Sequence, residues 1–208
     1  MRFVEVFVPK GVLTSEQVDL LARRLTLHGL YASEDGWTGS ADPGVLEFLE
    51  DITHVVVHET ATWVAGGRRL GPGEPPRFVV RVLVPGPWRK DLSEHLVTEI
   101  TRVLAEFAPD GVYERPHAEV YVLGVPEGGY GAFGRVVGDA AMTELIAKAK
   151  RGTEEPPPPG MVVDPVCGAT VSLDDPHTVT AVVDGTTHGF CCAGCRGHFH
   201  AARATGVA

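Results

Sequence analysis

The first 160 residues of this chain contain no cysteine, and all four cysteines lie in the last 48 residues. The chain also lacks any apolar run near the roughly 18 residues that a membrane-spanning helix needs. The N-terminal residues have no basic segment followed by an apolar core, so we expect no export signal. Clustered cysteines without such a signal indicate metal or redox chemistry in a reducing compartment. We therefore predict a cytoplasmic protein without a membrane partner.

Basic residues are scarce relative to acidic ones: 18 lysines and arginines stand against 27 aspartates and glutamates, for a formal net charge of −9. Binding along a nucleic-acid backbone requires a basic surface, so we expect no nucleic-acid partner. A hydrophobic content of 44% and a charged content of 22% are typical of a globular protein. At 208 residues, the chain is long enough for one domain of ordinary size and a small module.

The clearest domain boundary is the run of four prolines from Pro156 to Pro159. Prolines cannot donate backbone hydrogen bonds, and a run of them favours an extended spacer. We therefore predict a first domain at residues 1–150, a proline-rich linker at 151–160 and a second domain at 161–208. Within the first domain, a stretch rich in glycine and proline at residues 65–76 separates two halves, residues 1–70 and residues 77–147.

Similar strands are expected in the two halves. Residues 2–9 and 77–85 are both runs rich in β-branched residues that end in proline. A second strand is expected in each half, at residues 54–60 and 118–125. A strand, a helix and a strand in each half predict two βαβ units. The right-handed crossover makes the two strands of each unit parallel.

A helix signal follows the first strand of each half. Thr14 has the spacing of a capping box, and an apolar stripe at helical period then continues up to Gly29. In the second half, Asp91 and Glu94 take the same capping roles, and the turn residues at 109–111 stop the helix.

Three features of the first domain combine into a family pattern: the short N-terminal strand, the helix start at residues 14–17, and the stretch PEGGYGAFGR from Pro126 to Arg135. Together they resemble the tautomerase superfamily, which includes 4-oxalocrotonate tautomerase and its fused two-unit relatives. The resemblance implies an α+β fold in which two βαβ units form a four-stranded sheet backed by two helices. It also implies a homo-oligomer, usually a trimer.

The chemistry of that superfamily depends on an N-terminal proline whose amine is a general base. Here position 2 is Arg2, and the family's arginine just after the loop glycine, Gly11, is missing. Arg81, Arg89 and His117 could line a remnant pocket, but solvated surface positions are the simpler interpretation. We therefore assign no catalytic residue and do not expect an enzyme of the usual tautomerase type.

Three cysteines of the second domain have the spacing of metal ligands: Cys167, Cys191 and Cys195. Gly168 allows a tight turn directly after the first of them. A hairpin is expected at residues 178–188, with a type I′ turn at Asp184 and Gly185. The last two cysteines then start a short helix, in which side chains four residues apart share a face. Three sulfurs can therefore converge on one ion, which would supply much of the stability of so small a module.

The order Asp-Pro-Val-Cys-Gly at 164–168, a hairpin, and Phe-Cys-x-x-x-Cys-x-x-x-Phe at 190–199 resembles the YHS domain and the related TRASH-type metal-binding modules. The resemblance covers residues 161 to about 201. It implies a small treble-clef-like zinc-knuckle module in which the same three cysteines are metal ligands.

The fourth ligand is open among three residues. Relatives of this type often have a further cysteine where this chain has Asp164, and a carboxylate there could complete a tetrahedral site. Cys192 and His188 also differ from the usual residues at their positions, so they compete with Asp164. The methionine common after Cys-Gly is replaced by Ala169, which removes a thioether that would favour Cu(I). We expect Zn(II) first, with Cu or Hg as alternatives.

These patterns lead to three hypotheses of function. The first is a cytoplasmic metal-binding protein that senses, buffers or delivers a thiophilic ion through a three-cysteine site on an oligomeric tautomerase-like body. The second is a tautomerase-superfamily enzyme that acts without the N-terminal proline on enol or unsaturated acids. The third is an adaptor or assembly protein with a purely structural zinc and a protein partner that binds the C-terminal module.

Overall fold

The computed structural model describes residues 2–31, 42–70, 73–108, 111–152, 156–176 and 178–205. Contacts divide the chain into two compact units. The sheet unit comprises residues 1–33 and 50–126, and the cysteine unit comprises residues 34–49 and 127–208. Among the helices in the described ranges, none has the length and apolar character needed to cross a membrane.

The sheet unit is built on four long strands, hydrogen-bonded in the order β2-β1-β5-β6: β1 (Arg2–Pro9), β2 (Thr53–Thr60), β5 (Phe78–Pro85) and β6 (Ala118–Val125). β1 pairs with β2 in parallel, and β5 pairs with β6 in parallel. The two halves join through the antiparallel pair of β1 and β5. The predicted α+β class, the two parallel βαβ pairs and the four-stranded sheet are confirmed.

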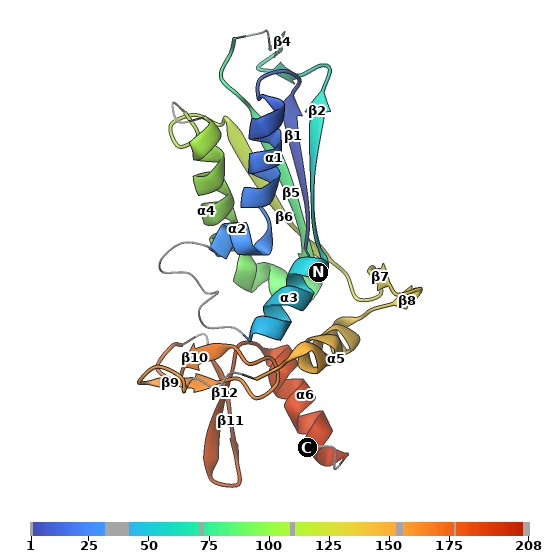
Figure 1. Ribbon diagram of the computed structural model, residues 1–208, viewed down its shortest axis with the longest axis vertical. Coiled ribbons are helices and arrows are strands. Elements are labelled where there is room, and N and C mark those ends of the chain that lie inside the picture. The colour runs from blue at the N-terminus through green and yellow to red at the C-terminus, as the bar shows by residue number, and fades with distance from the viewer. Residues whose placement is uncertain are drawn as a thin grey trace. The chain divides into compact units, whose positions relative to one another are not determined.

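The helices of the sheet unit lie on one face of this sheet (Figure 1). They are α1 (Ser15–Arg24), α2 (Leu27–Tyr31), the short 3₁₀ helix η2 (Gly86–Trp88) and α4 (Arg89–Phe107). The predicted capping box at Thr14 is confirmed, because its hydroxyl accepts the Gln17 N–H at 3.2 Å and the Gln17 side chain accepts the Thr14 N–H at 2.9 Å.

The predicted start of the second helix is wrong. α4 begins at Arg89, directly after η2, and its N-cap Trp88 makes no side-chain capping bond. Asp91 therefore lies in the first turn and does not cap the helix. The expected stop at residues 109–111 falls partly outside the described residues, because 109 and 110 are not described; α4 itself ends at Phe107.

The core of the sheet unit comes from strand alternation. Successive side chains of a strand point to opposite faces, so every second residue of β1 and β5 faces the helices. Six valines on these strands are at most 1% exposed: Val4, Val6, Val8, Val80, Val82 and Val84. Leu21 of α1 and Ile100 of α4 are fully buried as well. Phe78 lies on the same face as the valines of β5 and is 1% exposed, whereas the alternate residues, such as Glu5 and Arg81, lie on the opposite face.

Each half of the chain continues past its second long strand into a small hairpin that the sequence did not predict. β3 (Val64–Ala65) pairs with β4 (Arg68–Arg69), and β7 (Gly131–Ala132) pairs with β8 (Arg135–Val136). The first hairpin begins the expected connector at residues 65–76, of which 71 and 72 lie outside the described residues. The internal repeat therefore extends beyond the βαβ unit.

The cysteine unit contains two helices that the sequence did not predict, α3 (Pro43–Asp51, up to residue 49 in this unit) and α5 (Asp139–Ala149). Its other elements are β9 (Met161–Val163), β10 (Thr170–Ser172), β11 (Val179–Val183), β12 (Thr186–Phe190) and α6 (Ala193–Ala204). The predicted hairpin is confirmed as β11–β12. Asp184 and Gly185 both have positive φ, 51° and 78°, as a type I′ turn requires.

The division by contacts differs from the predicted domain limits of 1–150 and 161–208. α5 packs against α6, so residues 139–149 join the cysteine unit. The backbone N–H groups of Arg151 and Gly152 donate to the Asp42 carboxylate at 3.0 and 2.7 Å, so the first two linker residues are anchored. Residues 153–155 of the linker lie outside the described residues. The predicted limits are those of domains that fold independently of each other. Contacts in the folded chain do not test independent folding, so these limits remain a prediction.

His117 is a buried histidine at the start of β6, so the surface interpretation of this residue is wrong. It is 5% exposed, and its Nδ1 atom has no hydrogen-bond partner among the described residues. Burial lowers the pKa of His117, and the charges of Arg77 and Arg115 lower it further. The folded protein therefore holds this imidazole neutral at a pH where the unfolded chain already takes up a proton.

This difference predicts a pH dependence of folding. The unfolded state binds the extra proton as the pH falls through about 6.5, so the free energy of unfolding decreases on that side. The His117→Gln variant, which cannot titrate there, should lose less of its free energy of unfolding than the wild type between about pH 7.5 and 5.5. Denaturant titrations at the two pH values measure the difference. Equal losses in His117→Gln and wild type would contradict the assignment.

Candidate metal centre

The first part of the site is a tight turn at residues 164–169, between β9 and β10. The Asp164 N–H donates to the Ala169 carbonyl at 2.7 Å, and the Gly168 N–H donates to the Asp164 carbonyl at 2.9 Å. Gly168 has a φ of 76°, in the left-handed region that favours glycine. A Cβ atom at this position would also lie 2.6 Å from the Cβ of Asp42. The predicted turn at Gly168 is confirmed, and it leaves Cys167 only 7% exposed.

The second part of the site is the junction of β12 and α6. Cys191 follows the last residue of β12, Cys192 is the N-cap of α6, and Cys195 lies in the first turn of that helix. The prediction that Cys191 and Cys195 share a helix face is wrong, because Cys191 lies before the helix begins. Their sulfurs nevertheless meet, with the two Sγ atoms 3.7 Å apart.

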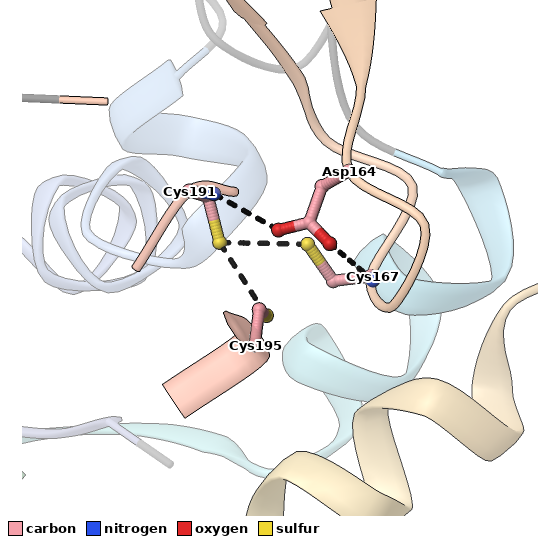
Figure 2. Close-up of side chains that lie close together, drawn as sticks. All are labelled: Asp164, Cys167, Cys191 and Cys195. Carbon is pink, nitrogen blue, oxygen red and sulfur yellow. Dashed lines mark hydrogen bonds between the residues drawn. The ribbon is translucent and has the colours of Figure 1, made fainter. Parts of the chain in front are cut away.

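The two parts bring four potential ligands together. Figure 2 shows the side chains of Asp164, Cys167, Cys191 and Cys195 in one cluster, hereafter the cage. The Sγ atoms of Cys167 and Cys191 are 3.5 Å apart. With one oxygen of the Asp164 carboxylate, the ligand atoms of the cage all lie within 4.8 Å of one another. No second group of this kind occurs among the described residues.

Asp164 is the organising residue of the cage. It is fully buried, and its carboxylate accepts three backbone N–H groups. Oδ1 accepts from Val166 at 2.8 Å and Cys167 at 3.3 Å, and Oδ2 accepts from Cys191 at 2.9 Å. A carboxylate oxygen has two lone pairs, so Oδ2 keeps one for a cation. Asp164 thus ties the turn to the end of β12 and still presents a donor atom.

The electrostatics of the cage favour a bound cation. Burial raises the pKa of Asp164, and the neighbouring Cys167 thiolate raises it further. Hydrogen bonds from the Cys191 and Cys195 thiols lower the pKa of Cys167. The hydrogen bonds of Cys191 with Cys167, Cys192 and Cys195 raise the pKa of Cys191. Within the described part of the chain, no basic side chain forms an ion pair with Asp164. A metal ion would compensate this buried concentration of negative donors.

The geometry of the cage can be compared with that of zinc. A tetrahedral zinc with Zn–S bonds of about 2.3 Å holds its sulfurs about 3.8 Å apart. The two measured sulfur–sulfur distances, 3.5 and 3.7 Å, differ from this value by a few tenths of an ångström. Three sulfurs and one carboxylate oxygen are also a donor set that zinc accepts. The residues present therefore fit a four-coordinate ion of this size.

The other two predicted candidates for the fourth ligand lie outside the cage. The His188 ring packs against the rings of Phe199 and Phe190, with centroids 5.0 and 6.5 Å away, so the histidine contributes to a small aromatic core between the hairpin and α6. Cys192 caps α6: its Sγ accepts the Cys195 N–H at 3.5 Å. Cys192 is half-buried and remains a free thiol beside the cage.

Sequence reasoning missed the support that the turn receives from α3 and α5. The buried Asp42 carboxylate accepts the N–H groups of Gly44 and Val45 at the start of α3, in addition to the two N–H groups after α5. Lys150, directly after α5, donates through Nζ to the Pro165 carbonyl at 2.5 Å. The dipeptide Asp42-Pro43 has the N-cap and N1 preferences of a helix start, and this signal could have identified α3.

No described contact gathers Arg81, Arg89 and His117 into a site. Arg81 is exposed, with its guanidinium 5.2 Å from the centroid of the Phe7 ring. Arg89 is exposed at the start of α4, so the surface interpretation holds for these two arginines.

The structural role of Asp164 is testable in the metal-free protein. Asp164→Ala leaves three buried N–H groups without their acceptor, and each unsatisfied group costs roughly 1–3 kcal/mol. Amide hydrogen exchange across residues 161–205, measured in the presence of a chelator, should become much faster. Asp174→Ala, which removes an exposed carboxylate from the same module, is the matched control. Exchange that is equally fast in both variants would refute this role.

No protein-family model and no curated protein matches this chain. Solved structures do match it. An asymmetric trimer of a wild-type fused 4-OT is 12% identical, with 69% of this chain and 98% of that chain covered and a TM-score of 0.47. A native fused 4-OT is 18% identical, with 64% and 94% covered and a TM-score of 0.44. A macrophage migration inhibitory factor-like protein from Entamoeba histolytica is 10% identical, with 65% and 97% covered and a TM-score of 0.44.

These matched structures are members of the tautomerase superfamily, which the first domain resembles. Their identities and TM-scores are too low to indicate what this chain binds or catalyses. The resemblance of residues 161–201 to YHS modules finds no counterpart in the comparisons and remains a prediction.

Proposed function

We propose that this protein binds one thiophilic metal ion in the cage and senses, buffers or delivers it. The observation that carries this proposal is the convergence of three sulfurs and a buried carboxylate within 4.8 Å of one another. Convergence of this kind is unfavourable without a cation, because burying a carboxylate beside a thiolate costs free energy unless an opposite charge compensates them. In this proposal Asp164 is the fourth ligand, in preference to Cys192 and His188, and residues 161–208 form a YHS-type module of the zinc-knuckle class.

Zn(II) is the first choice of ion. The cage combines soft thiolates with one hard carboxylate oxygen, and zinc accepts both donor types in tetrahedral sites. Cu(I) and Hg(II) prefer sulfur alone, so Asp164 disfavours them relative to an all-cysteine cage. Ala169, the last residue of the turn, is 2% exposed and has no thioether that could serve as a further soft ligand. All four cysteines are free thiols, which agrees with the reducing, cytoplasmic compartment proposed for the protein.

A purely structural zinc in an adaptor protein is the second candidate. Cys167, Cys195 and Asp164 are each at most 7% exposed, and the strands around them have only three to five residues. Such a module gains much of its stability from a bound metal. In that case the metal would close the module and leave its outer surface to bind a protein partner. The two candidates differ in whether the ion leaves the folded protein.

We further propose that the sheet unit is an oligomeric tautomerase-like body. The face of the sheet opposite the helices carries an apolar row, because Phe3 pairs with Leu83 and Leu83 pairs with Leu123. The next row, Glu5, Arg81 and Tyr121, is polar. Tyr121 and Leu123 are 47% and 44% exposed in the single chain. A broad, half-apolar sheet face of this kind is typical of an interface between copies, and a trimer is the expected state.

A tautomerase-superfamily enzyme acting on enol or unsaturated acids remains the alternative for this body. It predicts turnover that depends on residues of the sheet unit and persists after removal of residues 156–208. No contact of the described residues specifically favours it, so the metal-binding function stands first.

The metal content of the purified protein tests the proposal. Elemental analysis under reducing conditions should find close to one zinc per chain in the wild type. Replacing Cys191 and Cys195 together by serine should abolish the metal, because two of the four ligands are lost. Cys192→Ser is the matched control and should keep the metal, because this cysteine lies outside the cage. A wild-type protein that neither contains nor takes up metal would refute the proposed function.

A single charged substitution on the sheet face opposite the helices tests whether copies of the sheet unit associate through that face. Leu123→Glu should dissociate the assembly, because it buries an unpaired carboxylate in the proposed interface. Val97→Glu on α4 is the matched control, since Val97 is an apolar residue of similar exposure, 40%, on a helix. Sedimentation velocity distinguishes the states. If the wild type is monomeric, or if both variants stay assembled, this interface is wrong.

A further inference from the structure

The cage is not equally closed on all sides. Asp164 is fully buried, Cys167 is 7% exposed and Cys195 is 3% exposed. Cys191 is the exception, because this residue is exposed although its sulfur points to the other sulfurs. Cys191 is therefore the ligand residue with the most solvent contact.

The same side carries a fourth sulfur. Cys192 follows Cys191 directly, is half-buried, and lies outside the group of converging ligand atoms. Its Sγ accepts the Cys195 N–H, so the thiol is held close to the first turn of α6. A further sulfur therefore lies next to the ligand residue that is exposed.

The other ligands are held by structures that would have to open before they could release an ion. The Asp164 carboxylate is fixed by three backbone N–H groups. Cys167 lies in the turn that Gly168 closes, and Cys195 lies within α6. Cys191 belongs to neither β12 nor α6, so its side chain can leave the ion while the turn and the helix stay intact.

We infer that the metal ion is handed to a thiol-bearing acceptor through the Cys191 side of the cage, with Cys192 as the next sulfur on the way. This inference rests on the proposed function, and it selects delivery from among sensing, buffering and delivery. A thiol-bearing acceptor suits this ion, because its thiolate replaces a cysteine thiolate and the metal keeps a soft sulfur ligand.

The exchange conserves bonds, protons and charge. The Cys192 thiol loses its proton and its sulfur forms a bond to the metal. The bond between the metal and Cys191 breaks, and the Cys191 thiolate takes up the proton. The acceptor thiol then replaces Cys192, and afterwards the remaining ligands, by the same kind of step. No electron is transferred, so no oxidant or reductant is required.

The experiment uses the full chain loaded with one Zn(II). A chromophoric chelator with nitrogen and oxygen donors, in excess, reports the zinc that leaves. Glutathione is added over a range of concentrations, and S-methylglutathione, which has the same charge but no thiol, is the control. The release rate should rise in proportion to glutathione and stay constant with S-methylglutathione. A release rate that does not depend on glutathione would overturn the inference.

Variants and a second acceptor sharpen the result. Cys192→Ser should reduce the dependence of release on glutathione, and an unchanged dependence would also contradict the inference. A short peptide with two cysteines, compared with glutathione at equal thiol concentration, identifies the source of the acceptor. Faster transfer to the peptide supports a protein acceptor, and equal transfer supports a free small thiol. The experiment distinguishes failure of the inference from failure of the proposed function. A chain that binds no metal overturns both. A zinc-loaded chain whose release rate does not respond to thiols overturns only the proposed transfer.

Discussion

The buried carboxylate of Asp164 holds together two segments that are 27 residues apart in the sequence. One oxygen accepts the N–H groups of the turn that carries Cys167, and the other accepts the N–H of Cys191. Within the cage, this carboxylate is therefore the direct link between the turn and the junction of β12 and α6. A buried carboxylate beside a thiolate is itself unfavourable. Asp164 therefore has two effects: it positions the ligands, and its burial beside a thiolate favours a bound cation. The proposed metal site follows from these two effects.

The remainder of the cysteine unit supports that arrangement from outside. Asp42 accepts backbone N–H groups at the start of α3 and just after α5, and Lys150 donates to the Pro165 carbonyl within the turn. These contacts come from α3 and α5, so the module that carries the cage extends beyond the 48 residues that hold all the cysteines. A cage braced by folded helices can keep three ligands in place while a fourth one exchanges.

Local signals were sufficient for much of this protein, and the long-range contacts were not. The four long strands, the capping box at Thr14 and the Asp184-Gly185 turn depend on neighbouring residues, and all three were predictable. The start of α4 was missed because η2 precedes it and no side chain caps it. The spacing identified the three cysteines. It also predicted that Cys191 and Cys195 share a helix face, whereas Cys191 lies before the helix begins. Choosing Asp164 over His188 required the packing of His188 against Phe199, which no local pattern encodes.

The central claim is that one ion is bound by three sulfurs and one carboxylate oxygen. X-ray absorption at the metal edge of the zinc-loaded full chain tests it most directly, because it counts sulfur and oxygen neighbours separately. The account predicts three sulfurs at about 2.3 Å and one oxygen at about 2.0–2.2 Å. Asp164→Cys should convert this shell to four sulfurs. A wild-type shell of four sulfurs, or one made mainly of oxygen or nitrogen, would contradict the account.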